Sequence, residues 1–329
     1  MLVDLKAPAW ATHFLSDLTD WRKGPVPVAQ MRPFNLPDDA YFEYAYQDAA
    51  GERRPDPDNP NPRLNPWWTY ACNLTGPDYR PHPLAGLAGV RPRGRVLRLE
   101  IESRLLEESR RLMVYSPAGQ ADSVLPVILF QDGKAYYGWG KVPLIMDRLL
   151  EDGLIRPAHL VFLPPRRRTP EYAFNAVYRQ FIVVEVLQEL EGRIACSGER
   201  VAWGASLGGL LSAQLAWENP HLFQKVVTQS GAFLFSEDMD LKNPFAGGES
   251  FRKQVLGGPS RDIAWHLDCG TLEWLAASNR NLHAALEEKG ARASLVLRSA
   301  GHNWTNWRNG IPEGLLFALG QKSLENRSE

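Results

Sequence analysis

Apolar runs alternate with helical patterns from residue 95 onward. The runs with strand-like composition cover residues 95–103, 110–117, 124–131, 158–164, 199–204, 225–231, 263–268 and 293–299. Apolar spacing typical of helices lies between the later runs, over residues 174–190, 207–217 and 272–289. Because strands that alternate with helices form a mostly parallel sheet covered on both faces, the pattern predicts an α/β fold. The first two runs have no helix between them and should pair antiparallel at an edge.

The first 90 or so residues have a different pattern. They are rich in Pro, Asp, Asn and Trp, contain short strand-like runs such as residues 40–47, and show no helical period. This composition predicts a small β domain. Repeated prolines make residues 51–66 an ordered loop rather than a helix. The four tryptophans of this region suit a core, and the alternative is a stacking platform for sugar rings; they are Trp10, Trp21, Trp67 and Trp68.

Composition narrows the class of partner. The chain has 329 residues, 44% of them hydrophobic, and a formal net charge of −1. No global field attracts nucleic acid or an anionic membrane, so a small-molecule partner is expected. The start of the sequence lacks a basic, apolar leader and no stretch has the length of a membrane span, which favours a cytoplasmic protein. Three scattered cysteines without CxxC spacing indicate reduced thiols rather than disulfides or a zinc site.

One motif carries catalytic chemistry. Gly204-Ala205-Ser206-Leu207-Gly208 has the pattern G-x-S-x-G, with a strand-like run before it and an apolar helix after it. A serine on so sharp a turn needs glycines at both flanks, since side chains there would collide with the strand or the helix. The hydroxyl would then be exposed at a helix N-terminus, with the Leu207 N–H group available to an oxyanion. The alternative is a glycine-rich turn of an ordinary α/β protein.

A nucleophilic serine needs a histidine and an orienting acid, expected in the chain order Ser, acid, His. His302 is the best candidate for the base, because it follows the last predicted strand in a loop. Two acids compete at the end of the preceding strand, Asp268 and Glu273, and the residues alone do not decide between them. His266 and Asp268 share one strand face, but two metal ligands without a third make a metal site an unfavoured alternative.

A second oxyanion donor should follow an earlier strand. One apolar strand ends at Gln131, and in the loop expected after it Gly133 lets the backbone approach a substrate. The N–H group of Gly133 or Lys134 is therefore the candidate donor. Asp132 has the alternative role of capping the turn.

At these residues the chain resembles the esterase family that includes enterochelin esterases and, more distantly, esterase D and the mycolyltransferases. The resemblance rests on blocks in the family's order, which are QDG, RTPEYAFN, GASLGG, QSGAF, LDCGTLEWLAASNRNL and GHNWTNWRNG. It implies an α/β-hydrolase fold and ester hydrolysis without a cofactor, with Ser206 as nucleophile and His302 as base. The family's acid falls at the fourth position of G-x-x-D/E, which favours Glu273 over Asp268.

The resemblance also extends to the pocket and to the first domain. Arg168 and Glu171 match positions where the siderophore esterases carry Arg and Glu, so with Asp132 they are expected to shape the substrate pocket; the alternative is an ion pair at a loop mouth. The pieces FLSDLTDW and AYFEYAY resemble the immunoglobulin-like domain that precedes the enterochelin esterase catalytic domain, itself similar to some carbohydrate-binding modules. The chain is thereby divided into a β-sandwich over residues 1–92 and a hydrolase domain over residues 93–329.

The sequence thus predicts a serine esterase that forms an acyl-enzyme and passes the acyl group to water. An acyltransferase that uses a sugar or alcohol acceptor and a non-catalytic glycan-binding protein are the alternatives, and an amidase is disfavoured. The identity of the ester and the oligomeric state, including a homo-oligomer, are left open.

Overall fold

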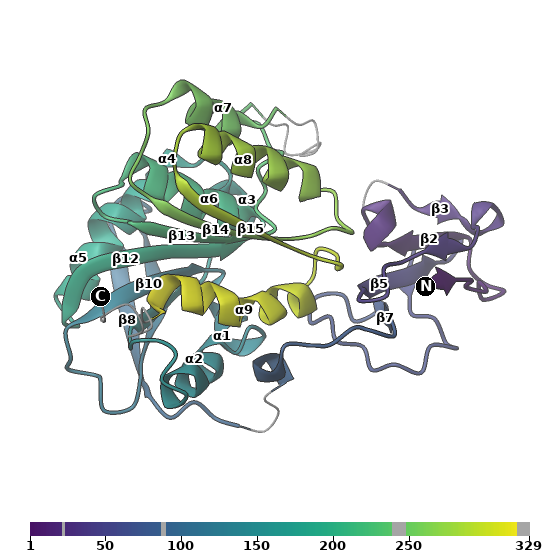
Figure 1. Cartoon of the computed structure of the whole chain (residues 1–329), viewed down its shortest axis with the longest axis horizontal. Helices are drawn as coiled ribbons and strands as arrows, with labels where there is room; N and C mark the ends of the chain where they lie inside the picture. The colour runs from purple at the N-terminus through teal and green to yellow at the C-terminus, as the bar shows by residue number, and fades with distance from the viewer. Residues whose placement is uncertain (22–23, 87–89, 239–247, 321–329) are drawn as a thin grey trace, which may run out of the picture.

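The main element of the protein is an eight-stranded sheet, seen in the computed structural model, which describes residues 1–21, 24–86, 90–238 and 248–320. Its order is β15-β14-β13-β12-β10-β11-β9-β8 (Figure 1). The strands are β8 (Arg95–Ser103), β9 (Glu108–Ser116), β10 (Leu125–Gln131), β11 (His159–Leu163), β12 (Cys196–Ala205), β13 (Lys225–Gln229), β14 (Ala264–Gly270) and β15 (Arg292–Arg298). Strands β10 to β15 pair in parallel and β9 and β8 add antiparallel, as the pattern predicted.

Helices cover both faces of this sheet (Figure 1). One face packs on α1 (Gly133–Gly138), α2 (Val142–Glu151) and α9 (Trp304–Leu319). The other packs on α3 (Arg168–Tyr172), α4 (Ala176–Gln180), the π-helix η4 (Phe181–Val186), α5 (Leu187–Glu191), α6 (Leu207–Glu218), α7 (Ser250–Gly257) and α8 (Ala276–Glu288). Successive side chains of β10 alternate between the two cores, since Leu129 faces α6 and Phe130 faces α9. The sheet is therefore buried on both faces, which explains its nearly continuous apolar strands.

Two stretches differ from the sequence-based expectation. The predicted helix over residues 174–190 is a succession of α4, η4 and α5, which begins at Ala176 and ends at Glu191. The stretch after Gln131, expected as a loop, forms the short helix α1, which begins at Gly133. A five- or six-residue helix is too short to leave an apolar period that can be recognised in the sequence.

The N-terminal region is all β apart from single 3₁₀ turns. A five-stranded antiparallel sheet contains β2 (His13–Ser16), β3 (Val26–Pro27), β5 (Tyr41–Gln47), β6 (Arg53–Arg54) and β7 (Cys72–Thr75), and β1 (Leu2–Val3) pairs with β4 (Phe34–Asn35). The turns are η1 (Asp17–Thr19), η2 (Val28–Gln30) and η3 (Pro83–Gly86). The proline-rich segment is irregular except for β6. Trp21 is a buried core residue, and the partly buried Trp68 packs against it with ring centroids 4.8 Å apart.

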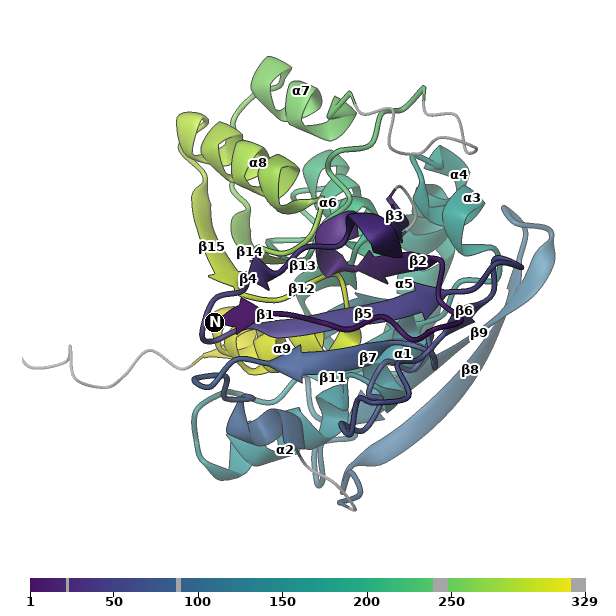
Figure 2. The ribbon, with the colours of Figure 1, turned by 90° about the vertical axis from the view of Figure 1, so that its right-hand side faces the viewer.

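This β region lies at the carboxyl edge of the parallel strands (Figures 1 and 2). The amide of Tyr41, at the start of β5, donates to the carbonyl of Ser299, directly after β15, at 2.9 Å. Nδ2 of Asn309 in α9 donates to the Tyr79 hydroxyl at 3.1 Å. We propose that the boundary between the two domains lies between residues 92 and 93.

Among the helices in the described ranges, none combines the length and the apolarity needed to cross a membrane.

Candidate active site

Ser206 occupies a strained turn between β12 and α6. Its φ of 55° and ψ of −123° lie in a region that non-glycine residues rarely adopt. Three backbone hydrogen bonds hold the turn: the Ser206 amide donates to the Gln229 carbonyl at 2.9 Å, and the Ser206 carbonyl accepts from the amides of Leu210 and Ala232 at 3.1 and 3.0 Å. Helix α6 thus begins at the residue after the serine, and the hydroxyl stays partly exposed at the carboxyl edge of the sheet.

Neighbouring atoms leave little or no room for side chains at the two flanking glycines. A Cβ atom on Gly204 would lie 2.2 Å from the carbonyl oxygen of Gly208, which no side chain tolerates. A Cβ atom on Gly208 would lie 3.1 Å from both Oδ2 of Asp132 and Cβ of Gln131. The turn that carries Ser206 is therefore packed closely on α6 and on the end of β10, and a side chain at position 204 would collide with the helix, as the motif predicted.

His302 and Glu273 form a pair at the same edge. Nδ1 of His302, in the loop after β15, lies 2.5 Å from Oε2 of Glu273, in the loop after β14. A carboxylate in this position accepts the Nδ1 proton, which leaves Nε2 as the basic nitrogen. Among the described residues, no hydrogen bond joins Ser206 to His302. The two are connected indirectly through residues 229–232. This segment makes backbone hydrogen bonds to Ser206, and its Ser230 hydroxyl donates to Glu273.

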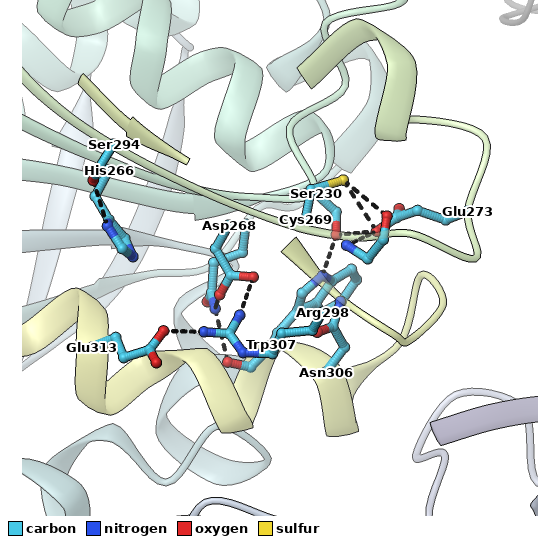
Figure 3. Close-up of polar contacts among 12 residues, drawn as sticks. Ser230, His266, Asp268, Cys269, Glu273, Ser294, Arg298, Asn306, Trp307 and Glu313 are labelled. Carbon is cyan, nitrogen blue, oxygen red and sulfur yellow. Dashed lines mark hydrogen bonds and ion pairs between the residues drawn. The ribbon is translucent and has the colours of Figure 1, made fainter. Parts of the chain in front are cut away.

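The Glu273 carboxylate is held at both oxygens. Oε1 accepts hydrogen bonds from the Ser230 hydroxyl at 2.6 Å and from the Gly270 amide at 2.8 Å (Figure 3). Nε1 of Trp307 donates to the same hydroxyl at 2.9 Å. The Glu273 side chain is fully buried, so these contacts fix the orientation from which it meets His302. Sequence reasoning missed Ser230 and Trp307, whose only signal was their position in the QSGAF and GHNWTNWRNG blocks.

Asp268 bonds to a different partner. One of its oxygens pairs with Arg298 and the other accepts from Nε2 of Gln229 at 2.9 Å (Figure 3). Burial raises the pKa of Asp268 to about 6, and the Arg298 guanidinium opposes that rise. Arg298 bonds in addition to Glu313 of α9. Of the two candidate acids, the structure therefore brings Glu273 to the histidine and directs Asp268 to α9.

The candidate oxyanion donors lie at two adjacent helix starts. Leu207 is the first residue of α6, and Gly133 and Lys134 are the first two of α1, so their N–H groups have no acceptor within their own helices. A Cβ atom on Gly133 would lie 2.3 Å from the carbonyl carbon of Phe162, which explains the glycine. Asp132 precedes it with a positive φ of 57°.

Asp132 and Arg168 form a bidentate ion pair behind the serine. Nε and Nη2 of Arg168 donate to the two Asp132 oxygens, both at 2.8 Å, and Nη2 also donates to the Ala205 carbonyl at 3.2 Å. Although burial disfavours the charged guanidinium, the Asp132 carboxylate raises the pKa of Arg168. The pair links the ends of β10 and β12 and braces the peptide that precedes Ser206.

Glu171 is bound to a different arginine. Both of its oxygens accept from the Arg110 guanidinium at 3.0 Å, and the amides of Arg166 and Arg167 donate to it at 3.0 and 2.8 Å. Burial opposes ionisation, but Arg110 and these amides together lower the pKa of Glu171. Glu171 thus shapes the loop after β11, and it does not pair with Arg168.

Aromatic rings surround the histidine. The His302 ring centroid lies 4.6 Å from that of Trp274 and 5.0 Å from that of Trp307. Trp67, from the N-terminal region, packs edge-on against Trp304 and Trp307 at 5.4 and 5.8 Å and remains 47% exposed. One tryptophan of the N-terminal cluster therefore lies beside the candidate site, where sequence reasoning offered only core or a sugar platform.

Comparisons with known proteins agree on one family. The family model described as "Putative esterase" matches residues 103–318. The iron(III) enterobactin esterase of Dickeya dadantii is 26% identical over 241 residues, which cover 67% of this chain and only 54% of that protein, so the match spans about half of its length.

Solved structures show the same fold. The ferric enterobactin esterase of Salmonella typhimurium superposes with a TM-score of 0.73 at 20% identity, over 93% of this chain and 88% of that one. The enterobactin esterase of Shigella flexneri, in the presence of enterobactin, gives a TM-score of 0.75 at 18% identity, over 94% and 87%. The coverage extends over the N-terminal all-β region as well as the large sheet.

Proposed function

The chain belongs to the esterase family whose model matches residues 103–318, and from this premise we propose that it hydrolyses small-molecule carboxylic esters through an acyl-enzyme on Ser206. The observation that supports the proposal most directly is the strained turn at Ser206 together with the 2.5 Å contact between His302 and Glu273 at the same sheet edge. A serine activated by an oriented imidazole is the nucleophile of acyl transfer.

In the proposed reaction, Oγ of Ser206 attacks the ester carbonyl carbon while Nε2 of His302 takes its proton. Glu273 keeps the imidazole in the required tautomer and stabilises the imidazolium. The alcohol leaves with the proton that His302 returns. A water molecule then gives a proton to His302 and attacks the acyl carbon. The bond from the acyl carbon to Oγ breaks, and His302 returns its proton to Oγ, which frees the acid and restores the serine. A hydrogen bond between Nε2 of His302 and Oγ of Ser206 is expected to form when substrate binds.

The developing oxyanion would be met by the N–H groups of Leu207 and of Gly133 or Lys134. The segments that carry these N–H groups are neighbours in space. Asp132, the residue before Gly133, packs against Gly208, the residue after Leu207. The Asp132–Arg168 pair would hold the two segments at a constant separation. Such preorganised donors contribute most when they need not reorient during the reaction.

A cavity of about 470 Å³ lies over β8 and β9 and reaches Pro164 and Lys134, and Lys134 is its only contact with the proposed site. Neither Ser206 nor His302 lines it, so the proposal does not assign the substrate to this cavity. The siderophore ester named for the relatives is one candidate substrate, together with acetylated or feruloylated sugars.

We also propose a cytoplasmic location. The cysteines of the described part of the chain are free, which is consistent with it.

Labelling with a fluorophosphonate and turnover of p-nitrophenyl acetate test the proposal. We expect wild type to react with both, Ser206→Ala with neither, and the matched variant Ser260→Ala, at an exposed serine, to behave as wild type. Equal labelling of Ser206→Ala and wild type would refute the assignment. A panel of esters that includes a ferric catecholate trilactone, compared by kcat/KM, then identifies the substrate, and addition of a sugar acceptor reveals any acyl transfer.

A further inference from the structure

The N-terminal region holds both loops that carry the proposed acid and base. Tyr41, the first residue of β5, donates its amide to the Ser299 carbonyl and also forms a β-bridge with Ala300. Ala300 lies two residues before His302. Leu272, the residue before Glu273, packs against the apolar core of the N-terminal sheet. These contacts order the two loops from the side opposite to the parallel strands.

One carboxyl group lies directly on the histidine loop. A Cβ atom on Gly301 would lie 2.0 Å from Cγ of Asp17 and 2.2 and 2.3 Å from its two oxygens. The φ of Gly301 is outside the left-handed region, so it is the carboxyl group, rather than the backbone conformation, that excludes a side chain there. Residue 301 is the neighbour of His302, and a shift of this peptide would move the imidazole.

Asp17 is itself fixed within the N-terminal region. It is 3% exposed, Nε1 of Trp21 donates to its Oδ1 at 2.9 Å, and the Glu43 amide donates to its Oδ2 at 2.7 Å. Glu43 is held in turn by the Tyr41 hydroxyl at 3.0 Å and by Nδ2 of Asn65 at 2.7 Å. A buried, doubly bonded carboxyl group is a rigid support for the loop above it.

The charges near Asp17 are those of Glu43 and Glu273. Burial, reinforced by the negative charge of Glu43, raises the pKa of Asp17 well above its usual range, and burial raises the pKa of Glu43 to about 7. A proton held by this pair reduces the negative charge beside Glu273. An acid can therefore pack on the loop without competing with Glu273 for the imidazole.

On the basis of the proposed function, we propose that Asp17 is a positioning residue for the reaction. Its carboxyl group, seated on Gly301, holds the loop that presents His302, so the N-terminal region completes the catalytic site instead of serving only as a separate binding module. Asp17 contacts neither the substrate nor the reacting atoms, and it affects the reaction by holding His302 in place.

Four variants of the full chain test this role: Gly301→Ala, Asp17→Ala, the double variant, and Gly257→Ala as the matched control, since a Cβ atom there meets nothing within 4 Å. We expect Gly301→Ala to lower kcat by on the order of 10²-fold with KM within about twofold, because a catalytic group displaced by about 1 Å costs that much. Asp17→Ala should lower kcat by about tenfold. The double variant should recover at least about tenfold over Gly301→Ala, because the clash is gone.

Two results would overturn the role: unchanged kcat in both Gly301→Ala and Asp17→Ala, or a folded double variant no more active than Gly301→Ala. Thermal unfolding monitors folding, and if the double variant does not fold, Asp17→Ala decides by its kcat alone. The rate of fluorophosphonate labelling separates the two proposals. A wild-type protein that does not label refutes the esterase mechanism, whereas normal labelling in wild type and every variant refutes only the role of Asp17.

Discussion

Oε2 of Glu273 lies 2.5 Å from Nδ1 of His302, although the two residues are 29 positions apart in the sequence. The loops after β14 and β15 meet at this point, where Ser230 fixes the other oxygen of Glu273 at 2.6 Å. The carboxylate has no freedom to turn away, because it is fully buried and bonded on both sides. The imidazole is thus oriented before any substrate arrives, which is the condition for fast proton transfer.

This pairing predicts that Glu273→Gln lowers kcat by on the order of 10³–10⁴-fold, since an amide in place of the carboxylate favours the wrong tautomer of His302. Asp268→Asn is the matched comparison, because Asp268 pairs with Arg298. It should lower the melting temperature while it leaves most of the turnover. Steady-state kinetics and thermal unfolding of both variants check this, and a folded Asp268→Asn that is inactive beside an active Glu273→Gln would reverse the assignment.

The serine turn predicts a strong effect of Gly204→Ala. The new methyl group would overlap the Gly208 carbonyl at 2.2 Å and open the turn. We expect the free energy of unfolding to fall by about 1–3 kcal/mol and kcat to fall by about 10²-fold. Denaturant unfolding and turnover measure the two effects. Gly192→Ala is the control, since its Cβ atom would meet only ordinary contacts at 3.6 Å, and equal behaviour of the two variants would contradict the prediction.

The Asp132–Arg168 pair predicts that Arg168→Lys lowers kcat by about 10- to 100-fold. A lysine keeps the charge but cannot make the two parallel bonds to Asp132 and the third to the Ala205 carbonyl. Arg292→Lys is the control, because its ion pair with Asp262 is exposed and contributes little. Kinetics with p-nitrophenyl acetate test the difference. Full activity of Arg168→Lys would show that the pair does not brace the serine turn.

His266 predicts a dependence of stability on pH. Its Nδ1 bonds to Ser294 at 3.0 Å, its ring stacks on Phe317, and burial lowers its pKa to about 4. Unfolding lets the imidazole bind a proton that the folded state excludes. Above pH 6.5 the imidazole is neutral in both the folded and the unfolded state, so this group does not affect stability. As the pH falls from 6.5 toward 4, protonation favours the unfolded state by up to about 3 kcal/mol.

The variant His266→Phe keeps a ring on Phe317 and cannot bind a proton. Between pH 7 and 4.5 its free energy of unfolding should fall less steeply than that of wild type, as measured by denaturant titration at several pH values. His221→Gln, which replaces an exposed histidine, is the control, and its free energy of unfolding should show the same pH dependence as that of wild type. Parallel pH profiles for His266→Phe and wild type would show that another group causes the acid sensitivity.

The sequence by itself determined the α/β sheet and the serine turn, because both depend on residues close together in the chain. Apolar runs separated by helical spacing require parallel strands buried on two faces. The glycines at 204 and 208 flank Ser206 closely enough that sterics alone imply the turn. The first turn of α1 escaped this reasoning, since so short a helix leaves no period.

The residues by themselves did not decide which acid meets His302; the family resemblance favoured Glu273, and the tertiary structure places its carboxylate 2.5 Å from the imidazole. Asp268 lies within β14 and Glu273 lies just after it, and this difference of a few residues directs Asp268 toward α9 and Glu273 to the histidine. The contact between Asp17 and Gly301 has no local signal at all, since its partners come from opposite ends of the chain. Periodicity and sterics act over a few residues, whereas such pairings follow from the burial of the whole chain, which no local pattern encodes.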